Sequence, residues 1–109
     1  MMQSNFIEVD GIRTHVLQAG EGSETVLLLH GGGVDGAELS WKLVIPVLAE
    51  RFRVIAPDWP GYGRSGESEH GMTLQELMEF CLGLMKQMEL PSVHLVGLSM
   101  GGGAGRGLG

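Results

Sequence analysis

The placement of glycine constrains the fold of this chain more than any other feature. Glycine accounts for 19 of the 109 residues, or about 17%, where about 7% is usual. The glycines gather in four places, which are residues 31–33, 61–66, 97–103 and the last five positions. Apolar segments separate the first three clusters, so these glycines mark turns between buried elements rather than low-complexity sequence.

The apolar segments predict five strands. Residues 6–9 and 12–17 flank the dipeptide Asp10-Gly11, which favours the tight turn of a β-hairpin. Continuous apolar runs are typical of strands that are buried on both faces. Three such runs follow the hairpin, at residues 25–29, 52–56 and 93–96.

Two helices are predicted between these strands. The segment 73–76 (Thr-Leu-Gln-Glu) forms a capping box, and apolar residues recur behind it at helical spacing as far as about Glu89. The segment 40–50 predicts another helix, bent or divided at Pro46. Because strands and helices alternate, the predicted fold class is α/β, with an N-terminal hairpin, a mostly parallel sheet of about five strands and flanking helices.

A candidate nucleophile follows the last predicted strand. Residues 97–101 (Gly-Leu-Ser-Met-Gly) match the pattern G-x-S-x-G. In this pattern the serine lies on a sharp turn between strand and helix, which lifts its hydroxyl clear of the sheet and beside free helix amides. The motif therefore identifies Ser99 as a candidate for nucleophilic attack on a carbonyl group.

Two more glycine-rich turns follow predicted strands. Residues 30–33 (His-Gly-Gly-Gly) leave backbone amides open to a carbonyl oxygen, as in an oxyanion hole. Residues 61–66 match G-x-G-x-x-G, the pattern of a dinucleotide site. Such a site requires a helix that opens within the glycines, and the next predicted helix starts only at Thr73, so we reject the nucleotide interpretation.

The three motifs, in this order and spacing, resemble the α/β-hydrolase family. They are HGGG at 30–33, DWPGYGRSG at 58–66 and GLSMGG at 97–102. More narrowly, they look like the compact bacterial branch of esterases, carbon–carbon bond hydrolases and perhydrolases. The resemblance covers residues 6–104, which implies an incomplete α/β-hydrolase fold.

The resemblance also implies roles for individual residues. Ser99 is the implied nucleophile, and the implied oxyanion-hole amides are those of Met100 and Gly32, with Gly33 as the alternative. The implied reaction is acyl transfer on a small ester or a related carbonyl compound, with no cofactor and no metal. Relatives with an Asp nucleophile do not fit, because position 99 is Ser.

Several polar or aromatic residues have a functional and a structural interpretation. His30 and Trp41 are candidates for lining the pocket. For His30 we favour a structural hydrogen bond over a role as a catalytic base, and for Trp41 simple helix packing is the alternative. His15 is expected to be a solvated strand residue and His94 a hydrogen-bonded core residue. Asp58, which precedes a turn, is expected to stabilise that turn rather than to act as a catalytic acid.

The chain offers no base downstream of the nucleophile. A serine needs a histidine oriented by an acid, and in this family both follow the serine in sequence. The ten residues after Ser99 contain neither. We therefore interpret residues 1–104 as the N-terminal part of a hydrolase core domain, inactive as it stands, and 105–109 as an atypical glycine-rich tail. The alternative is a non-catalytic fragment, either a pseudogene product or half of a two-chain assembly.

Charge and cysteine content limit the classes of binding partner and the cellular compartment that the sequence predicts. With 7 Lys and Arg against 13 Asp and Glu, the net charge is −6, which disfavours nucleic acid and anionic membranes. One cysteine cannot form a disulfide within the chain. No apolar run reaches the roughly 18 residues of a membrane span, and the N-terminus does not resemble a signal peptide. We expect a cytoplasmic protein whose partner is a small-molecule substrate; the sequence does not predict the oligomeric state.

Overall fold

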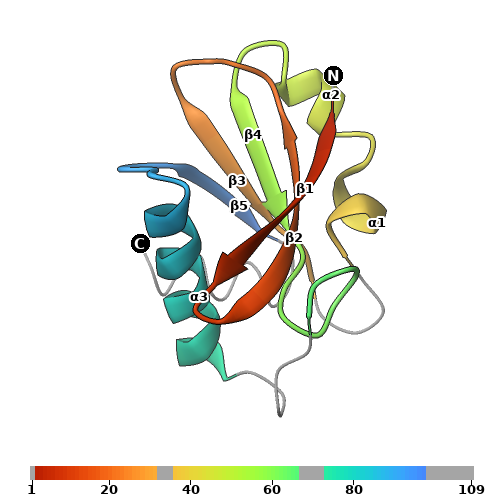
Figure 1. Cartoon of the computed structure of the whole chain (residues 1–109). Helices are drawn as coiled ribbons and strands as arrows, with labels where there is room; N and C mark the ends of the chain where they lie inside the picture. The colour runs from red at the N-terminus through yellow and green to blue at the C-terminus, as the bar shows by residue number, and fades with distance from the viewer. Residues whose placement is uncertain (1, 32–35, 67–72, 98–109) are drawn as a thin grey trace.

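A computed structural model describes residues 2–31, 36–66 and 73–97 (Figure 1). The strands form one mixed sheet in the order β1-β2-β4-β3-β5. Their bounds are Gln3–Val9 (β1), Ile12–Ala19 (β2), Thr25–Leu29 (β3), Arg53–Pro57 (β4) and His94–Gly97 (β5). The predicted α/β class and its five strands are confirmed.

The sheet combines an antiparallel and a parallel part. β1 pairs antiparallel with β2, and β2 pairs antiparallel with β4. β3 runs parallel to both β4 and β5. The hairpin turn places Asp10 at φ 49 and Gly11 at φ 84, and two successive residues with positive φ give the twist that joins antiparallel strands tightly.

Among the described residues, three helices connect the parallel strands (Figure 1). Helices α1 (Ala37–Trp41) and α2 (Ile45–Leu48) lead from β3 to β4, and α3 (Leu74–Gln87) leads from β4 to β5. The prediction of a helix over 40–50, bent or divided at Pro46, differs from this in two ways: helix starts already at Ala37, and the break lies before Ile45 rather than at Pro46. Pro46 lies in the first turn of α2, where its missing N–H costs no helical hydrogen bond.

The predicted capping box of α3 is confirmed. The Thr73 hydroxyl accepts a hydrogen bond from the Glu76 amide at 3.1 Å, and the Glu76 carboxylate accepts one from the Thr73 amide at 3.0 Å. In the described part of the chain, no helix has the length and apolar character required to cross a membrane.

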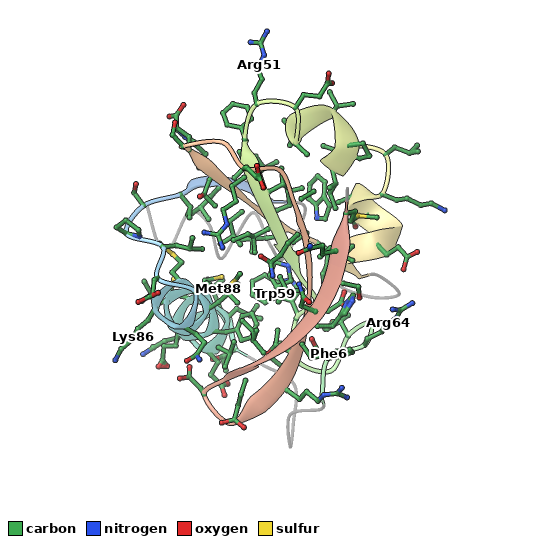
Figure 2. The ribbon with its side chains drawn as sticks, turned by 45° about the horizontal axis from the view of Figure 1, so that its top comes forward. Phe6, Arg51, Trp59, Arg64, Lys86 and Met88 are labelled. Carbon is green, nitrogen blue, oxygen red and sulfur yellow. The ribbon has the colours of Figure 1, made fainter. Side chains whose placement is uncertain are left out.

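The sheet is buried on both faces. Alternate residues of β3 point in opposite directions, Leu27 and Leu29 toward the α3 cluster and Val26 and Leu28 toward the α1 and α2 cluster. Figure 2 shows Trp59 inside the molecule, whereas Arg51 and Lys86 point outward. The continuous apolar run at 25–29 therefore has the burial that its sequence predicts.

Candidate active site

The carboxyl ends of β3, β4 and β5 lie at one edge of the sheet, the edge at which ligands bind in open α/β sheets (Figure 1). β3 lies between the other two and pairs in register with β5, Leu29 opposite Gly97. Neighbouring strands are about 4.8 Å apart. The chain therefore leaves β3 and β5 from adjacent points, and the predicted common edge is confirmed for the strands.

Four predicted site residues lie outside the described residues. These are Ser99, Met100, Gly32 and Gly33. Their roles as nucleophile and oxyanion-hole donors stay predictions from the sequence. The described part of the same edge consists of His30 and Gly31 after β3 and of residues 58–66 after β4.

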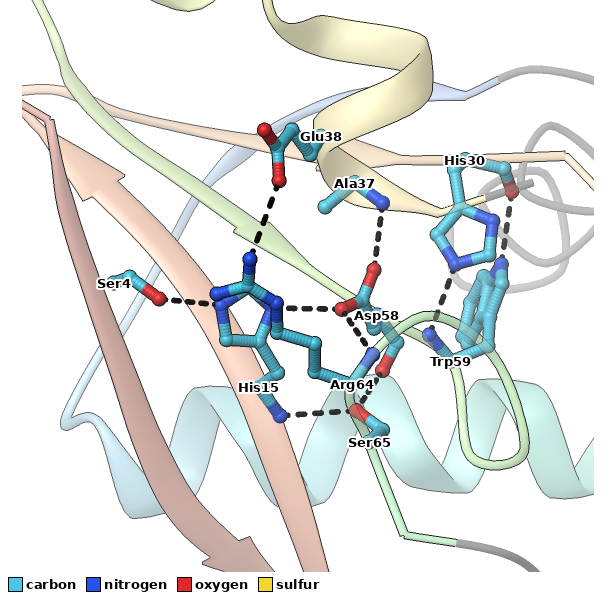
Figure 3. A network of polar contacts seen from close by, with 9 residues as sticks. All are labelled: Ser4, His15, His30, Ala37, Glu38, Asp58, Trp59, Arg64 and Ser65. Atoms are coloured by element: carbon cyan, nitrogen blue, oxygen red, sulfur yellow. Dashed lines mark hydrogen bonds and ion pairs between the residues drawn. The ribbon is translucent and has the colours of Figure 1, made fainter.

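His30 joins the two described loops (Figure 3). Its Nδ1 donates to the Gly31 carbonyl at 2.6 Å, and its Nε2 accepts a hydrogen bond from the Trp59 amide at 3.0 Å. The Trp59 indole also donates to the His30 carbonyl at 2.8 Å. The side chain is fully buried, and both ring nitrogens form hydrogen bonds. His30 therefore holds the two loops together and is not available as a base. Pocket lining by His30 stays a prediction.

Asp58 is the centre of a second network at this edge (Figure 3). Its Oδ1 accepts from the Ala37 amide at 2.6 Å, and its Oδ2 accepts from the Arg64 amide at 3.1 Å and from His15 Nδ1 at 2.7 Å. Gly63 adopts φ +52, and a Cβ there would overlap the Asp58 carboxylate. The carboxylate thus holds the turn and the start of α1, as expected for a turn-stabilising residue.

Two histidine predictions were wrong. His15 was expected to be solvated, but it is only 1% exposed, because β2 lies inside the sheet between β1 and β4. His94 was expected in the core, but its side chain is exposed and lies 3.0 Å from a Glu24 oxygen. Its strand, β5, lies at an edge of the described sheet, and none of the four β5 residues is fully buried.

Trp41 and Cys81 are both buried in the core. Trp41 packs on the α1 and α2 side, and its indole N–H is buried without a hydrogen-bond partner in the described part of the chain. Its role in a pocket stays a prediction. Burial raises the pKa of the Cys81 thiol to about 12, so this cysteine is a core residue and not a nucleophile, as its place on the apolar stripe of α3 predicts.

A hollow of about 580 Å³ lies at the opposite end of the sheet. It is lined by residues near the start of β4 and the end of β2, including Gln18, Gly20, Arg51 and Arg53. Ligands of parallel sheets bind at the carboxyl ends of the strands, so we do not assign the active site to this hollow. Within the described ranges, no group of three or more His, Cys, Asp or Glu residues is arranged to hold a metal ion.

Comparison with known proteins identifies the family of this chain. Residues 24–106 match the family model described as alpha/beta hydrolase fold. The dihydrolipoyllysine-residue acetyltransferase component of the acetoin cleaving system of Cupriavidus necator is 40% identical over 98 residues, 90% of this chain and 26% of that protein. The 2-hydroxy-6-oxo-6-(2'-aminophenyl)hexa-2,4-dienoic acid hydrolase of Metapseudomonas resinovorans is 37% identical over 105 residues, 94% of this chain and 36% of that protein.

A solved structure has the same fold. The 2-hydroxy-6-oxo-6-phenylhexa-2,4-dienoate hydrolase from Rhodococcus sp. strain RHA1 superposes with a TM-score of 0.90 at 35% identity, over 99% of this chain and 41% of that one. The chain thus spans about a quarter to two fifths of the lengths of these three relatives.

Proposed function

We propose that this chain, which belongs to the alpha/beta hydrolase family, carries the nucleophile and the oxyanion hole of a serine hydrolase that acts by acyl transfer. Ser99 attacks the substrate carbonyl carbon. The amides of Met100 and of Gly32, or of Gly33 in its place, stabilise the negative charge that develops on the carbonyl oxygen.

The pairing of Leu29 with Gly97 carries this proposal. Gly32 follows Leu29 by three residues and Ser99 follows Gly97 by two. A chain extends at most about 3.6 Å per residue, so both groups lie within about 11 Å of adjacent strand ends. This spacing supports a single site that holds both a nucleophile and an oxyanion donor.

The substrate class that we propose is a small carbonyl compound, either an ester or a 2-hydroxy-6-oxo-dienoate. The second choice rests on the hydrolases of such dienoates among the relatives. Both classes present a carbonyl carbon that Ser99 can attack. The proposed partner is this small molecule alone, without nucleic acid or membrane, in the cytoplasm.

The base of the reaction must come from elsewhere than His30, whose ring nitrogens are both engaged. We propose that the acid and the histidine of the triad lie outside this chain, since in this family both follow the serine in sequence. The chain by itself is then inactive at Ser99. The second candidate function is a non-catalytic fragment, which the glycines at 105, 107 and 109 favour, since each costs about 1 kcal/mol in a helix.

A chimera tests the proposal. Residues 1–104 are joined to the C-terminal remainder of the Metapseudomonas resinovorans hydrolase, and loss of the dienoate chromophore is followed. We expect turnover that falls by at least about 10³-fold in the matched Ser99→Ala chimera, since the nucleophile and its base act as one unit. A chimera that folds, as judged by circular dichroism, but does not turn over the dienoate or a nitrophenyl ester would favour the non-catalytic alternative.

A further inference from the structure

A Ser-His-Asp array that is separate from the proposed Ser99 site lies beside the N-terminal hairpin (Figure 3). The Ser4 hydroxyl is 2.6 Å from His15 Nε2, and His15 Nδ1 is 2.7 Å from Asp58 Oδ2. The serine comes from β1, the histidine from β2 and the acid from the turn after β4. A catalytic triad is recognised by such contacts and roles, and the order of its residues in the sequence differs between folds.

The contacts define the roles of the three groups. The Asp58 carboxylate also accepts hydrogen bonds from the Ala37 and Arg64 amides, so it is held in place from two sides. Because a carboxylate accepts hydrogen bonds, the His15 nitrogen facing it carries the hydrogen. In the neutral ring the other nitrogen then presents its lone pair to the Ser4 hydroxyl, which is the arrangement of a general base.

The array combines an accessible nucleophile with a fixed base. Ser4 is exposed, whereas His15 and Asp58 are 1% and 3% exposed. The Phe6 ring packs on the His15 imidazole, with 5.2 Å between the ring centroids. The base therefore keeps its orientation while solvent and small molecules reach the serine.

We propose that Ser4 is a second nucleophile of this chain, activated by His15 and oriented by Asp58, and that it accepts acyl groups from aryl esters with good leaving groups. The Ser4 oxygen attacks the carbonyl carbon while its proton passes to His15 Nε2. The new bond joins Ser4 Oγ to the acyl carbon, the bond from that carbon to the aryl oxygen breaks, and the aryl alcohol leaves with the proton. This leaves an acyl-serine and a neutral imidazole.

The surroundings of Ser4 suit an aromatic leaving group. Phe6 lies two residues further along the same face of β1 and is 39% exposed. The Arg13 guanidinium carbon is 3.8 Å from the centre of the Phe6 ring. An aryl group can pack against this ring, and the cation beside it stabilises the negative charge that develops on the aryl oxygen as its bond to the acyl carbon breaks.

The test uses p-nitrophenyl acetate and the full chain carrying Ser99→Ala. Because Ser99 is absent from every variant, the result is independent of the proposed function. Trypsin releases residues 1–13, in which Ser4 is the only hydroxyl-bearing side chain, so mass spectrometry locates the acetyl group. The matched reference is Ser23, another exposed serine, on the tryptic peptide 14–42.

We expect Ser4 to be acetylated at least about 10²-fold faster than Ser23, which is the usual lower bound for general-base assistance. Ser4→Ala removes the acetyl group from the 1–13 peptide except for slow reaction of the N-terminal amine. His15→Gln lowers the rate at Ser4 to that at Ser23. Equal rates at Ser4 and Ser23 would overturn the proposal, as would a Ser4 rate unchanged in a folded His15→Gln variant.

A thiol variant keeps the test decisive if His15→Gln does not fold. Ser4→Cys and Ser23→Cys are alkylated with iodoacetamide at pH 7, where the buried Cys81 does not compete. A thiol beside an imidazole has more thiolate character than a solvated one. We expect alkylation of the Ser4→Cys variant to be at least about tenfold faster, and equal rates would contradict the assignment of His15 as a base.

Discussion

The two faces of the sheet are covered in different ways. One face carries α3, a helix of 14 residues whose cap is made by its own neighbours in sequence. The other carries α1 and α2, which have five and four residues and no side-chain cap. Both faces bury an apolar cluster. The start of α3 is therefore fixed by local signals, whereas the start of α1 depends on a residue that is distant in sequence.

This distant residue is Asp58. Its carboxylate accepts one hydrogen bond from the Ala37 amide at the start of α1 and another from the Arg64 amide in the turn after β4. These bonds span 21 and 6 residues of sequence. It thereby links the short-helix face to the carboxyl edge of the sheet. This difference teaches that Asp58 ties the candidate active edge to the α1 and α2 face, whereas the start of α3 is fixed by its own neighbours in sequence.

Removing the Asp58 carboxylate should destabilise the face of the sheet that α1 and α2 cover. Asp58→Ala leaves His15 and two backbone amides without their acceptor, and breaking such a buried pair costs about 3–5 kcal/mol. Urea unfolding followed by circular dichroism measures the loss. The control is Glu38→Ala, whose carboxylate forms an exposed ion pair with Arg64 at 3.8 Å and should cost less than about 1 kcal/mol. Equal effects of the two variants would refute the central role of Asp58.

Truncating the core of the other face should have a slightly smaller effect. Leu84 is fully buried under α3, and Leu84→Ala is expected to cost about 2–5 kcal/mol. The fluorescence of the two tryptophans reports on the two faces separately. Trp59 packs against Phe80 on the α3 face, and Trp41 belongs to the cluster on the other face. In single-tryptophan variants, Leu84→Ala should change the Trp59 emission more than the Trp41 emission. The reverse order would show that the faces are not independent.

The buried thiol on α3 should make this face sensitive to alkaline pH. Burial raises the pKa of Cys81 from 9.0 to about 12, so the unfolded chain ionises this group first. Its contribution to stability is complete below pH 9 and is lost as the pH rises toward 12, with a slope of at most about 1.4 kcal/mol per pH unit. Urea unfolding at pH 8 to 10.5 should show this slope in the native chain, and Cys81→Ala should reduce it. An unchanged slope in the variant would assign the effect to other groups.

The capping box should contribute least. Thr73→Ala removes the hydroxyl that accepts a hydrogen bond from the Glu76 amide. The loss of such a cap typically lowers the free energy of unfolding by about 1 kcal/mol. Thr73→Ser keeps the oxygen and serves as the matched control. Thermal unfolding should show a lower midpoint for the alanine variant alone, and indistinguishable midpoints would mean that the cap adds nothing to the packing of α3.

Local patterns in the sequence predict the hairpin, the buried strand at 25–29 and the capped helix α3. Each depends on neighbours within a few residues, such as Asp10-Gly11 or Thr73 and Glu76. The division of α1 and α2 and the burial of His15 depend on contacts across the sheet, so local patterns do not reveal them. Even so, the tight turn at Asp10-Gly11 fixes the register that pairs Phe6 with His15, which places Ser4 diagonally beside that histidine.

The sequence predicts some features of the candidate site and not others. The order of the three glycine-rich motifs predicts that their strands end at one edge, and the parallel pairing of β3 with β4 and β5 confirms it. A structural hydrogen bond was predicted for His30, but its partner Trp59 was not, because a hydrogen bond across 29 residues has no local signature.

The central claim is that β3 and β5 deliver the oxyanion loop and the nucleophile turn from adjacent points. NMR of the isotopically labelled chain tests it directly through nuclear Overhauser effects between backbone protons of these strands. We predict effects that link Leu27 with Leu95 and Leu28 with Val96, in parallel register. A pattern that lacks these effects, or that shifts the pairing by one or more residues, would contradict the account.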